Sequence, residues 1–175
     1  MIGIIDLEIC NLKSIQSAIY NLGYDLKILN KKNIDFKKIS HLIIPGVGSF
    51  SNISKEYFED KEFDKNLRLF VKSGNPILGI CLGMHFLSRY GNENGQNKGL
   101  GLIDASVDLM PYDNSKNFNL PHVGWNEIEI VQKHELFHKI KDKSNFYFVH
   151  SYQMNLNDEK NCFGKTKYLK NFSSI

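Results

Sequence analysis

Cys81 lies where the sequence predicts the end of a strand and the start of a helix. The apolar run Pro76–Ile80 precedes it, and the helix-like stretch Met84–Leu87 follows it. Gly79 and Gly83 flank the cysteine, and a Cβ at either position would crowd the tight turn that such a junction needs. The pattern is typical of a nucleophile elbow, which holds one reactive side chain on a strained turn.

The predicted helix would point its N-terminus at the sulfur of Cys81, where its partial positive charge favours the thiolate over the thiol. The alternative is an unreactive cysteine buried at a strand–helix junction. The paired glycines favour the nucleophile. The other cysteines, Cys10 and Cys162, are far apart and form no Cys-x-x-Cys pair. The sequence therefore indicates neither a disulfide framework nor a zinc cluster, and it favours a reducing compartment.

A thiolate that attacks an acyl group needs N–H donors for the oxyanion that forms. The backbone N–H of Leu82 is one candidate. A second could come from Pro45–Gly48, because two glycines let the backbone turn an N–H inward. The alternative for this segment is an ordinary glycine-rich turn. Beside an elbow cysteine the donor loop is the better interpretation, since both motifs follow predicted strands and α/β sheets place their sites at such ends.

Three histidines are candidates for the same site or its surroundings. His150 follows a predicted strand and could be the base for Cys81 or line its pocket, although a single histidine at a strand end is more often structural. His85 lies one helical turn beyond the cysteine. His122 belongs to the distinctive segment Pro121–Asn126, which we expect to be a loop. This segment carries the only tryptophan, and an exposed aromatic on a rigid loop favours partner contact over catalysis.

His134 and His138 complete a His-Glu-x-x-His pattern, in which zinc proteases place two histidines one helical turn apart. Lysines crowd this segment, and any third ligand is remote in the sequence. We therefore expect a surface turn with Leu136 and Phe137 packed inward, and no metal.

Length and composition indicate one globular domain, residues 1–175, able to bury a sizeable core. The chain has 42% hydrophobic residues and a net charge of +3 with scattered lysines, so a nucleic-acid partner is not indicated. The N-terminus has no basic region, and its apolar run ends at Asp6. We expect neither a signal peptide nor a membrane span, and therefore a cytoplasmic location.

The segments around these motifs alternate between strand and helix patterns. Apolar runs predict strands at Ile2–Ile5, Tyr24–Leu29 and His41–Ile44. Apolar residues at helical spacing predict helices over Asn11–Leu22 and Phe63–Val71. Because the strands are apolar throughout and alternate with helices, we predict an α/β fold with a mostly parallel sheet and helices on both faces.

The second half of the chain has a different pattern. Alternating residues predict strands at Ala105–Leu109, Trp125–Ile130 and Asn145–Val149, which suggest a small antiparallel extension. No internal repeat, low-complexity stretch or linker interrupts the sequence.

Several segments, in order along essentially the whole chain, resemble the class I glutamine amidotransferase family, and more closely the glutaminase subunits of imidazole glycerol phosphate synthases. Gly-x-Cys-x-Gly marks the broad family, whereas Pro-His-Val-Gly-Trp-Asn and Phe-Val-His-Ser-Tyr are specific to this branch. The resemblance implies a flavodoxin-like core. The matching segments are Ile4–Asp6 with Asn11–Ser14, Pro45–Phe50, Gly79–Met84, Gly99–Leu102, Pro121–Asn126 and Phe148–Tyr152.

The resemblance implies a glutaminase that needs no cofactor. Cys81 would attack the side-chain amide of glutamine, release ammonia and leave a γ-glutamyl thioester for water to hydrolyse. The ammonia would pass, shielded from solvent, into a (β/α)₈-barrel cyclase partner that forms imidazole glycerol phosphate in histidine biosynthesis.

The resemblance also implies roles for single residues. Val47 and Gly48 would supply the adjustable oxyanion donor and Leu82 the fixed one. Glu93 would hold the α-ammonium group of glutamine. The other implied substrate contacts are His85, His150, Ser151 and Tyr152. The implied partner interface contains Asn11, Pro121, His122, Trp125 and Asn126.

Three departures from the family pattern stand out. His85 replaces a glutamine that usually contacts substrate, and Leu7–Cys10 lacks the usual glycines of a partner-side loop. The family's catalytic His-x-Glu pair belongs to a Phe-His-Pro-Glu segment, which the sequence lacks up to Ile175. We therefore expect either a truncated domain or a natural short form, with little or no activity.

The sequence is also compatible with two other functions. A paralogue could feed ammonia to a different acceptor, such as an amidino-sugar pathway, and the genes beside it would distinguish the two pathways. A catalytically silent subunit could only stabilise or regulate its partner. The retained elbow thiol and donor loop argue against a silent subunit, because a scaffold has no physical need for either.

Overall fold

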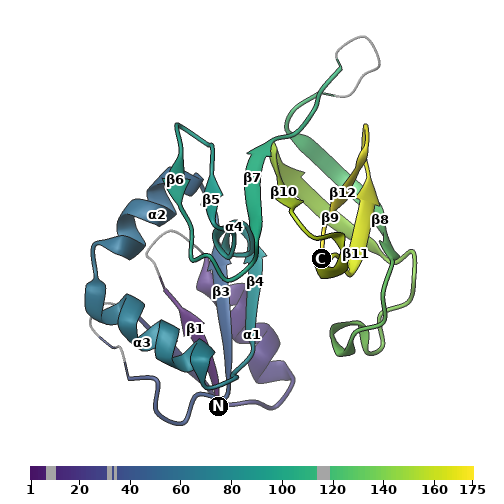
Figure 1. The fold of residues 1–175 in the computed structure, drawn as a ribbon. Coiled ribbons are helices and arrows are strands. Elements are labelled where there is room, and N and C mark those ends of the chain that lie inside the picture. The colour runs from purple at the N-terminus through teal and green to yellow at the C-terminus, as the bar shows by residue number, and fades with distance from the viewer. Residues whose placement is uncertain (7–10, 31–32, 34, 114–118) are drawn as a thin grey trace.

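Two sheets lie side by side in the computed structural model, which describes residues 1–6, 11–30, 33, 35–113 and 119–175 (Figure 1). One is a four-stranded parallel sheet flanked by helices, and the other is an eight-stranded mixed sheet. The predicted α/β class is confirmed. Within the described residues, no helix is both long and apolar enough to cross a membrane.

The parallel sheet has the strand order β2-β1-β3-β4. Its strands were all predicted from their apolar runs, and β1 has the predicted bounds. Both faces of β1 are buried, which explains why its residues are apolar without alternation. The strands are β1 (Ile2–Ile5), β2 (Leu26–Leu29), β3 (His41–Gly46) and β4 (Ile77–Cys81).

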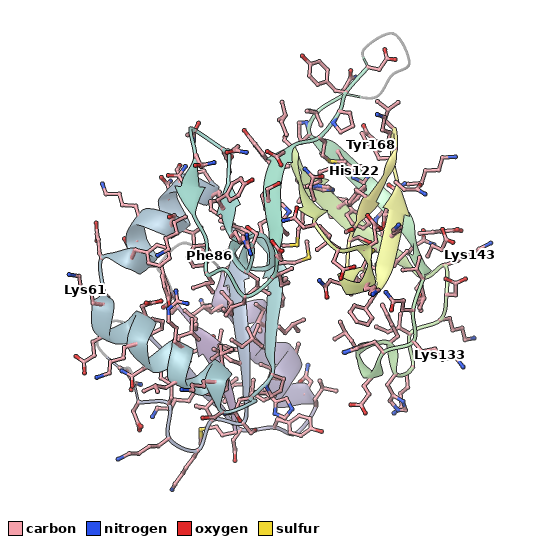
Figure 2. All side chains as sticks on the ribbon, viewed as in Figure 1. Lys61, Phe86, His122, Lys133, Lys143 and Tyr168 are labelled. Atoms are coloured by element: carbon pink, nitrogen blue, oxygen red, sulfur yellow. The ribbon has the colours of Figure 1, made fainter. Side chains whose placement is uncertain are left out.

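The helices lie on both sides of this sheet, as predicted. Figure 1 shows α1 on one side and α2 and α3 on the other. The main hydrophobic core joins the sheet to α2, α3 and α4, with Phe86 near its centre (Figure 2). The helices are α1 (Leu12–Asn21), α2 (Phe50–Phe58), α3 (Lys61–Lys72) and α4 (Leu82–Phe86).

The helix α2 was not predicted from the sequence. Its buried face is formed by Phe50, Ile53 and Tyr57, spaced as on one side of a helix, and the side chain of Ser49 caps its start. Polar residues between them hide this pattern.

The second sheet is larger than the small extension that we expected. Its strand order is β6-β5-β7-β10-β12-β11-β8-β9, and among the described strands of this sheet only β5 and β7 pair in parallel. The strands β5, β6 and β10 were not predicted. The strands are β5 (Tyr90–Gly91), β6 (Asn97–Lys98), β7 (Ala105–Leu109), β8 (His122–Ile130), β9 (Asn145–His150), β10 (Tyr152–Leu156), β11 (Gly164–Lys167) and β12 (Asn171–Ser173).

Two expectations about this half were wrong. The segment Pro121–Asn126 is not a loop, because β8 starts at His122 and pairs with β9 along its first six residues. Leu136 does not pack inward with Phe137. Both belong to the short 3₁₀ helix η2 (Glu135–Phe137), where Phe137 is buried and Leu136 is exposed. A second 3₁₀ helix, η3 (Glu159–Asn161), precedes β11.

Candidate active site

Cys81 has the backbone of a nucleophile elbow. Its φ is 55° and its ψ is −118°, in a region that residues with a side chain rarely adopt. A Cβ on Gly79 would lie 2.5 Å from Cα of Met84, and one on Gly83 would lie 1.7 Å from the carbonyl oxygen of Ile44. Both glycines are therefore required by close backbone approach, and the turn presents an exposed thiol.

The predicted donor loop lies beside this thiol. Gly46, the last residue of β3, pairs with Cys81, the last residue of β4, so the segment that follows Gly46 starts at the elbow. Gly48 has a φ of 100°, which favours glycine there, and Val47 is exposed. On the other side, Leu82 starts α4, where backbone N–H groups have no partner within the helix. The segment that follows Gly46 and the first residue of α4 thus both adjoin Cys81.

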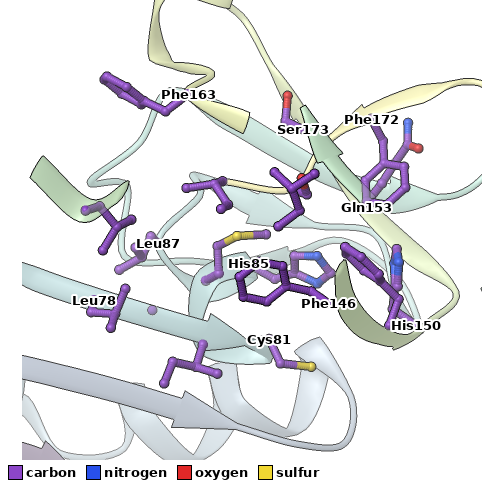
Figure 3. Close-up of a pocket in the computed structure, with 18 of the residues that line it drawn as sticks. Leu78, Cys81, His85, Leu87, Phe146, His150, Gln153, Phe163, Phe172 and Ser173 are labelled. Carbon is purple, nitrogen blue, oxygen red and sulfur yellow. The ribbon is translucent and has the colours of Figure 1, made fainter. Parts of the chain in front are cut away.

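A cleft of about 650 Å³ opens between β4 and the second sheet. Figure 3 shows Cys81 on one wall, with Phe146 and His150 of β9 across from it. His85 also lines the cleft, whereas most other lining side chains are apolar. The structure therefore brings together the cysteine and two of the histidines that the sequence singled out.

His85 is held in its neutral form. Burial, together with the nearby His150, lowers the pKa of His85 to about 4. A neutral imidazole can accept a proton or a hydrogen bond but supplies no positive charge near Cys81. Within the described residues, no side chain caps or hydrogen-bonds the thiol, so the structure shows no thiol–base pair of the kind that activates a cysteine.

His150 is engaged at both ring nitrogens. Its Nδ1 lies 2.8 Å from the carbonyl oxygen of Tyr152, which can only accept, so Nδ1 carries the proton. Its Nε2 lies 3.0 Å from Nδ1 of His122. Because the proton of the neutral His150 ring is on Nδ1, Nε2 can only accept a hydrogen bond from His122. Burial lowers the pKa of His150, which keeps this ring neutral. The geometry favours a structural role for His150 over that of a base.

His122 contradicts its predicted place at a partner surface. The side chain is only 1% exposed. It stacks on Tyr168 with 4.1 Å between the ring centroids (Figure 2), and its Nε2 lies 2.8 Å from the amide oxygen of Asn126. Because side chains alternate along a strand, His122 faces the interior while Trp125, three residues on, faces outward.

The outward face of β8 and β9 is apolar and exposed. Trp125 is 70% exposed and lies edge-on to Tyr147, with which it is paired across the two strands. Val123 and Val149 form the next outward pair. Of this patch, only Trp125 was predicted from the sequence. The alternation of Val123 with Trp125, and of Tyr147 with Val149, was the signal that could have identified the whole patch.

The remaining predicted site residues lie outside the cleft lining. The carboxylate of Glu93 accepts a hydrogen bond from the backbone N–H of Phe50 at 2.7 Å. Ser151 alone lies between β9 and β10, and its carbonyl oxygen accepts a hydrogen bond from the backbone N–H of Met110, whereas Tyr152 is the first residue of β10. Asn11 and Pro121 are exposed, and Asn11 caps α1. The predicted partner-side loop 7–10, which includes Cys10, lies outside the described residues.

The His134–His138 pattern does not have the α-helical geometry that zinc proteases use. Nδ1 of His134 accepts a hydrogen bond from the backbone N–H of Leu136, and the segment is a 3₁₀ turn rather than an α-helix that would place both histidines on one face. The described part of the chain contains no group of three or more His, Cys, Asp or Glu side chains that could hold a metal ion.

Comparisons with known sequences agree with this geometry. A family model described as "Glutamine amidotransferase class-I" matches residues 3–173. The chain is 41% identical over 175 residues to the imidazole glycerol phosphate synthase subunit HisH of Methanocaldococcus jannaschii, a match that covers 100% of this chain and 84% of the relative. It is 38% identical over 174 residues to subunit HisH 2 of Methanococcus maripaludis, covering 99% and 84%.

Solved structures show the same fold at low sequence identity. A crystal structure of a glutamine amidotransferase superposes with a TM-score of 0.68 at 17% identity and covers 97% of this chain and 85% of that one. The structure of PurLQS from Thermotoga maritima superposes with a TM-score of 0.71 at 13% identity and covers 97% and 76%.

Proposed function

Because the chain belongs to the class I glutamine amidotransferase family, we propose that it is a glutaminase subunit that releases ammonia from the side-chain amide of glutamine for a synthase partner. The curated relatives are subunits of imidazole glycerol phosphate synthase, which supports the same product in histidine biosynthesis and a cytoplasmic location. The observation that carries the proposal is the strained backbone of Cys81 beside the donor loop.

In the proposed reaction, the Cys81 sulfur forms a bond to the amide carbon of glutamine. The C=O electron pair moves onto oxygen, where the backbone N–H groups of Leu82 and of the Val47–Gly48 segment stabilise it. Collapse of this intermediate breaks the C–N bond, and the leaving nitrogen takes the proton that the thiol gave up, which releases ammonia. The γ-glutamyl thioester that remains is hydrolysed by water, which restores the thiol and gives glutamate.

In the proposed complex, Glu93 would hold the α-ammonium group of glutamine, and Ser151 and Tyr152, where β9 gives way to β10, would meet its carboxylate end. His85 and His150, which line the cleft, would add further contacts. The neutral state of both rings suits contact with an uncharged amide, because neither adds a charge next to the leaving group.

The proposed partner is a (β/α)₈-barrel cyclase, which would cover the outward face of β8 and β9. This face presents Val123, Trp125, Tyr147 and Val149 together. An ammonia route has to exclude water, and an apolar aromatic rim provides that seal. Asn11 and Pro121 complete the proposed contact. His122 and Asn126 are left out of it, because they hydrogen-bond to each other on the inner face of β8.

A second candidate function is favoured by His85. The family usually has a glutamine at this position, and here a neutral imidazole lines the cleft. A paralogue that feeds ammonia to an amidino-sugar pathway would differ in such contacts. A catalytically silent subunit is not favoured, because the strained elbow is retained.

The test is glutamine-dependent synthesis with purified partner cyclase. Ammonia, product and glutamate are measured with glutamine or ammonium salts as the nitrogen source. The proposal predicts that Cys81→Ala loses whatever synthesis from glutamine the wild type supports, however low, but keeps synthesis from ammonium, and that the histidine-pathway cyclase is the partner activated. Glutamine-dependent synthesis that survives in Cys81→Ala would overturn it.

A further inference from the structure

Glu93 makes an unexpected contact with the start of α2. Its Oε2 accepts a hydrogen bond from the backbone N–H of Phe50 at 2.7 Å, across forty-three positions of sequence. Next to it, the side-chain amide of Asn94 donates to Oγ of Ser51 at 3.4 Å. The turn after β5 therefore clasps the first turn of α2 at two adjacent points.

The turn that carries Glu93 is itself fixed. Asn94 and Gly95 have φ values of 57° and 93°, which close the turn tightly. The amide of Asn97 donates to the carbonyl oxygens of Glu93 and Gly95, at 3.0 Å and 2.7 Å. Because both ends of the turn are held by one side chain, the Glu93 carboxylate is presented in a defined place.

Phe50 is equally constrained. Its side chain is 1% exposed and packs on Phe86 of α4 with 6.0 Å between ring centroids. A Cβ on Gly91 would lie 2.5 Å from the Phe50 ring, so the β5 backbone lies directly against it. The ring fixes the side chain of this residue, and Glu93 fixes its backbone N–H.

The donor loop is a short bridge between two anchored ends. Gly46 is anchored by its pairing with Cys81, and Phe50 is anchored by Glu93. Only residues 47–49 lie between them. Gly48 has a positive φ, and Val47 is exposed, so neither is fixed by burial. The orientation of the N–H groups in residues 47–49 then depends on the two anchored ends. The anchor at Phe50 is a strong one, because a hydrogen bond to a carboxylate is about twice as strong as a neutral one.

We propose that Glu93 is a positioning residue that fixes the oxyanion-donor loop of Cys81 through the backbone N–H of Phe50. The inference extends the proposed function, in which the same carboxylate takes the α-ammonium group of glutamine. One oxygen serves the loop and the other remains for the ammonium group. Substrate recognition and donor placement thus share one side chain.

Two variants separate the two tasks of this carboxylate. Glu93→Gln keeps an oxygen that can accept from Phe50 but removes the charge that attracts an ammonium group. Glu93→Ala removes both, and Glu93→Asp keeps the charge but withdraws the oxygen by one methylene. Glu159→Gln is the matched control, because Glu159 is an exposed carboxylate paired with Lys165 in the second sheet. Far-UV circular dichroism verifies that each variant folds.

The first measurement is amide hydrogen exchange of peptides that cover residues 47–53. Glu93→Ala and Glu93→Asp should exchange about tenfold faster than the wild type, as expected for losing a hydrogen bond to a charged group. Glu93→Gln, which keeps a neutral and weaker acceptor, should exchange at a rate between those of the wild type and Glu93→Ala, and the Glu159→Gln control should stay within about twofold of the wild type. Unchanged exchange in both Glu93→Ala and Glu93→Asp would overturn the inference, whatever the other results.

The second measurement is the rate at which a diazoketone analogue of glutamine alkylates Cys81. Glu93→Gln should raise the half-saturating concentration with little change in the saturated rate, whereas Glu93→Ala should also lower the saturated rate. If Glu93 only stabilised the fold, the two variants would not differ in which of these two kinetic quantities they change. Equal saturated rates in both variants would overturn the inference. If the analogue does not label the wild type saturably, the proposed function fails, while the exchange result still decides the role of Glu93.

Discussion

The thiol of Cys81 sits on a backbone that its own side chain disfavours, so its neighbours must hold it there. The hydrogen-bonded pairing of β3 with β4 and the close approach of α4 do this, and they leave no room for a Cβ at position 83. Strain of this kind persists only where the surrounding structure imposes it. The elbow is therefore a property of several residues that fit together.

Gly83→Ala tests this fit. The added Cβ would lie 1.7 Å from the carbonyl oxygen of Ile44, so β3 and α4 have to separate. We expect a loss of more than about 2 kcal/mol in the free energy of unfolding, measured by urea denaturation. Gly95→Ala is the control, because it meets no atom within 4 Å and suffers only the strain of a positive φ. Equal losses in both variants would show that contact at Gly83 is not the cause.

His85 should make stability depend on pH. Its pKa is lowered to about 4 in the folded chain, so between that value and its ordinary pKa the unfolded chain binds a proton that the folded chain does not. Above about pH 6.5 His85 does not lower the free energy of unfolding. As the pH falls below that value, protonation of His85 in the unfolded chain lowers this free energy, by about 3 kcal/mol at pH 4. His85→Gln should lose less stability than the wild type between pH 7 and pH 4. Parallel curves for the two proteins would contradict this.

The helices and strands that were predicted correctly are those whose own residues show a clear apolar pattern. The strand β1 has the bounds that its apolar run predicted, and β7 has those that its alternating residues predicted. The helix α1 differs from its prediction by one residue at each end. The helix α2 was missed because polar residues interrupt its apolar face. The strand β10 was missed because its residues are stabilised by two neighbouring strands rather than by their own pattern.

In the candidate site, too, the features that depend on neighbouring residues were predicted and the contacts between distant segments were not. Two glycines at fixed spacing identified Cys81, because their effect on the turn is local. The hydrogen bond between His122 and His150, and that between Glu93 and Phe50, join distant parts of the chain. No spacing in the sequence indicates such contacts.

The outward face of β8 and β9 is the surface that we expect to bind the cyclase partner. Trp125→Ala should weaken binding to the cyclase partner by at least about tenfold, since large aromatic residues at the centre of an interface contribute most of the affinity. Isothermal titration calorimetry with the purified partner measures it. Tyr20→Ala on α1 is the control, because Tyr20 is also exposed but lies on another surface. Unchanged affinity in Trp125→Ala would remove this face from the proposed interface.

At the scale of the whole molecule, the cleft gives the chain an apolar surface on an edge strand. β4 is at one end of the parallel sheet, and its side chains Leu78 and Ile80 are exposed. An exposed apolar edge strand promotes association between chains. These 175 residues should therefore aggregate at high concentration when no partner is present.

Leu78→Lys should reduce this association, because a charge on an edge strand opposes pairing with another chain. Light scattering across a concentration series measures it. Leu69→Lys on α3 is the control, since Leu69 is exposed on a helix away from the edge. A wild-type chain that stays monomeric throughout the series, or an equal effect of both substitutions, would contradict the role of β4.

The most direct measurement of the central claim, that Cys81 is a nucleophile for the side chain of glutamine, is peptide mapping by mass spectrometry after brief treatment with the diazoketone analogue of glutamine. We expect one adduct per chain, on Cys81, formed at a rate that saturates and is slowed by L-glutamine but not by D-glutamine. Cys162 is fully buried and should stay unmodified. Modification of Cys162 before Cys81, or a rate at Cys81 that L-glutamine does not slow, would contradict the account.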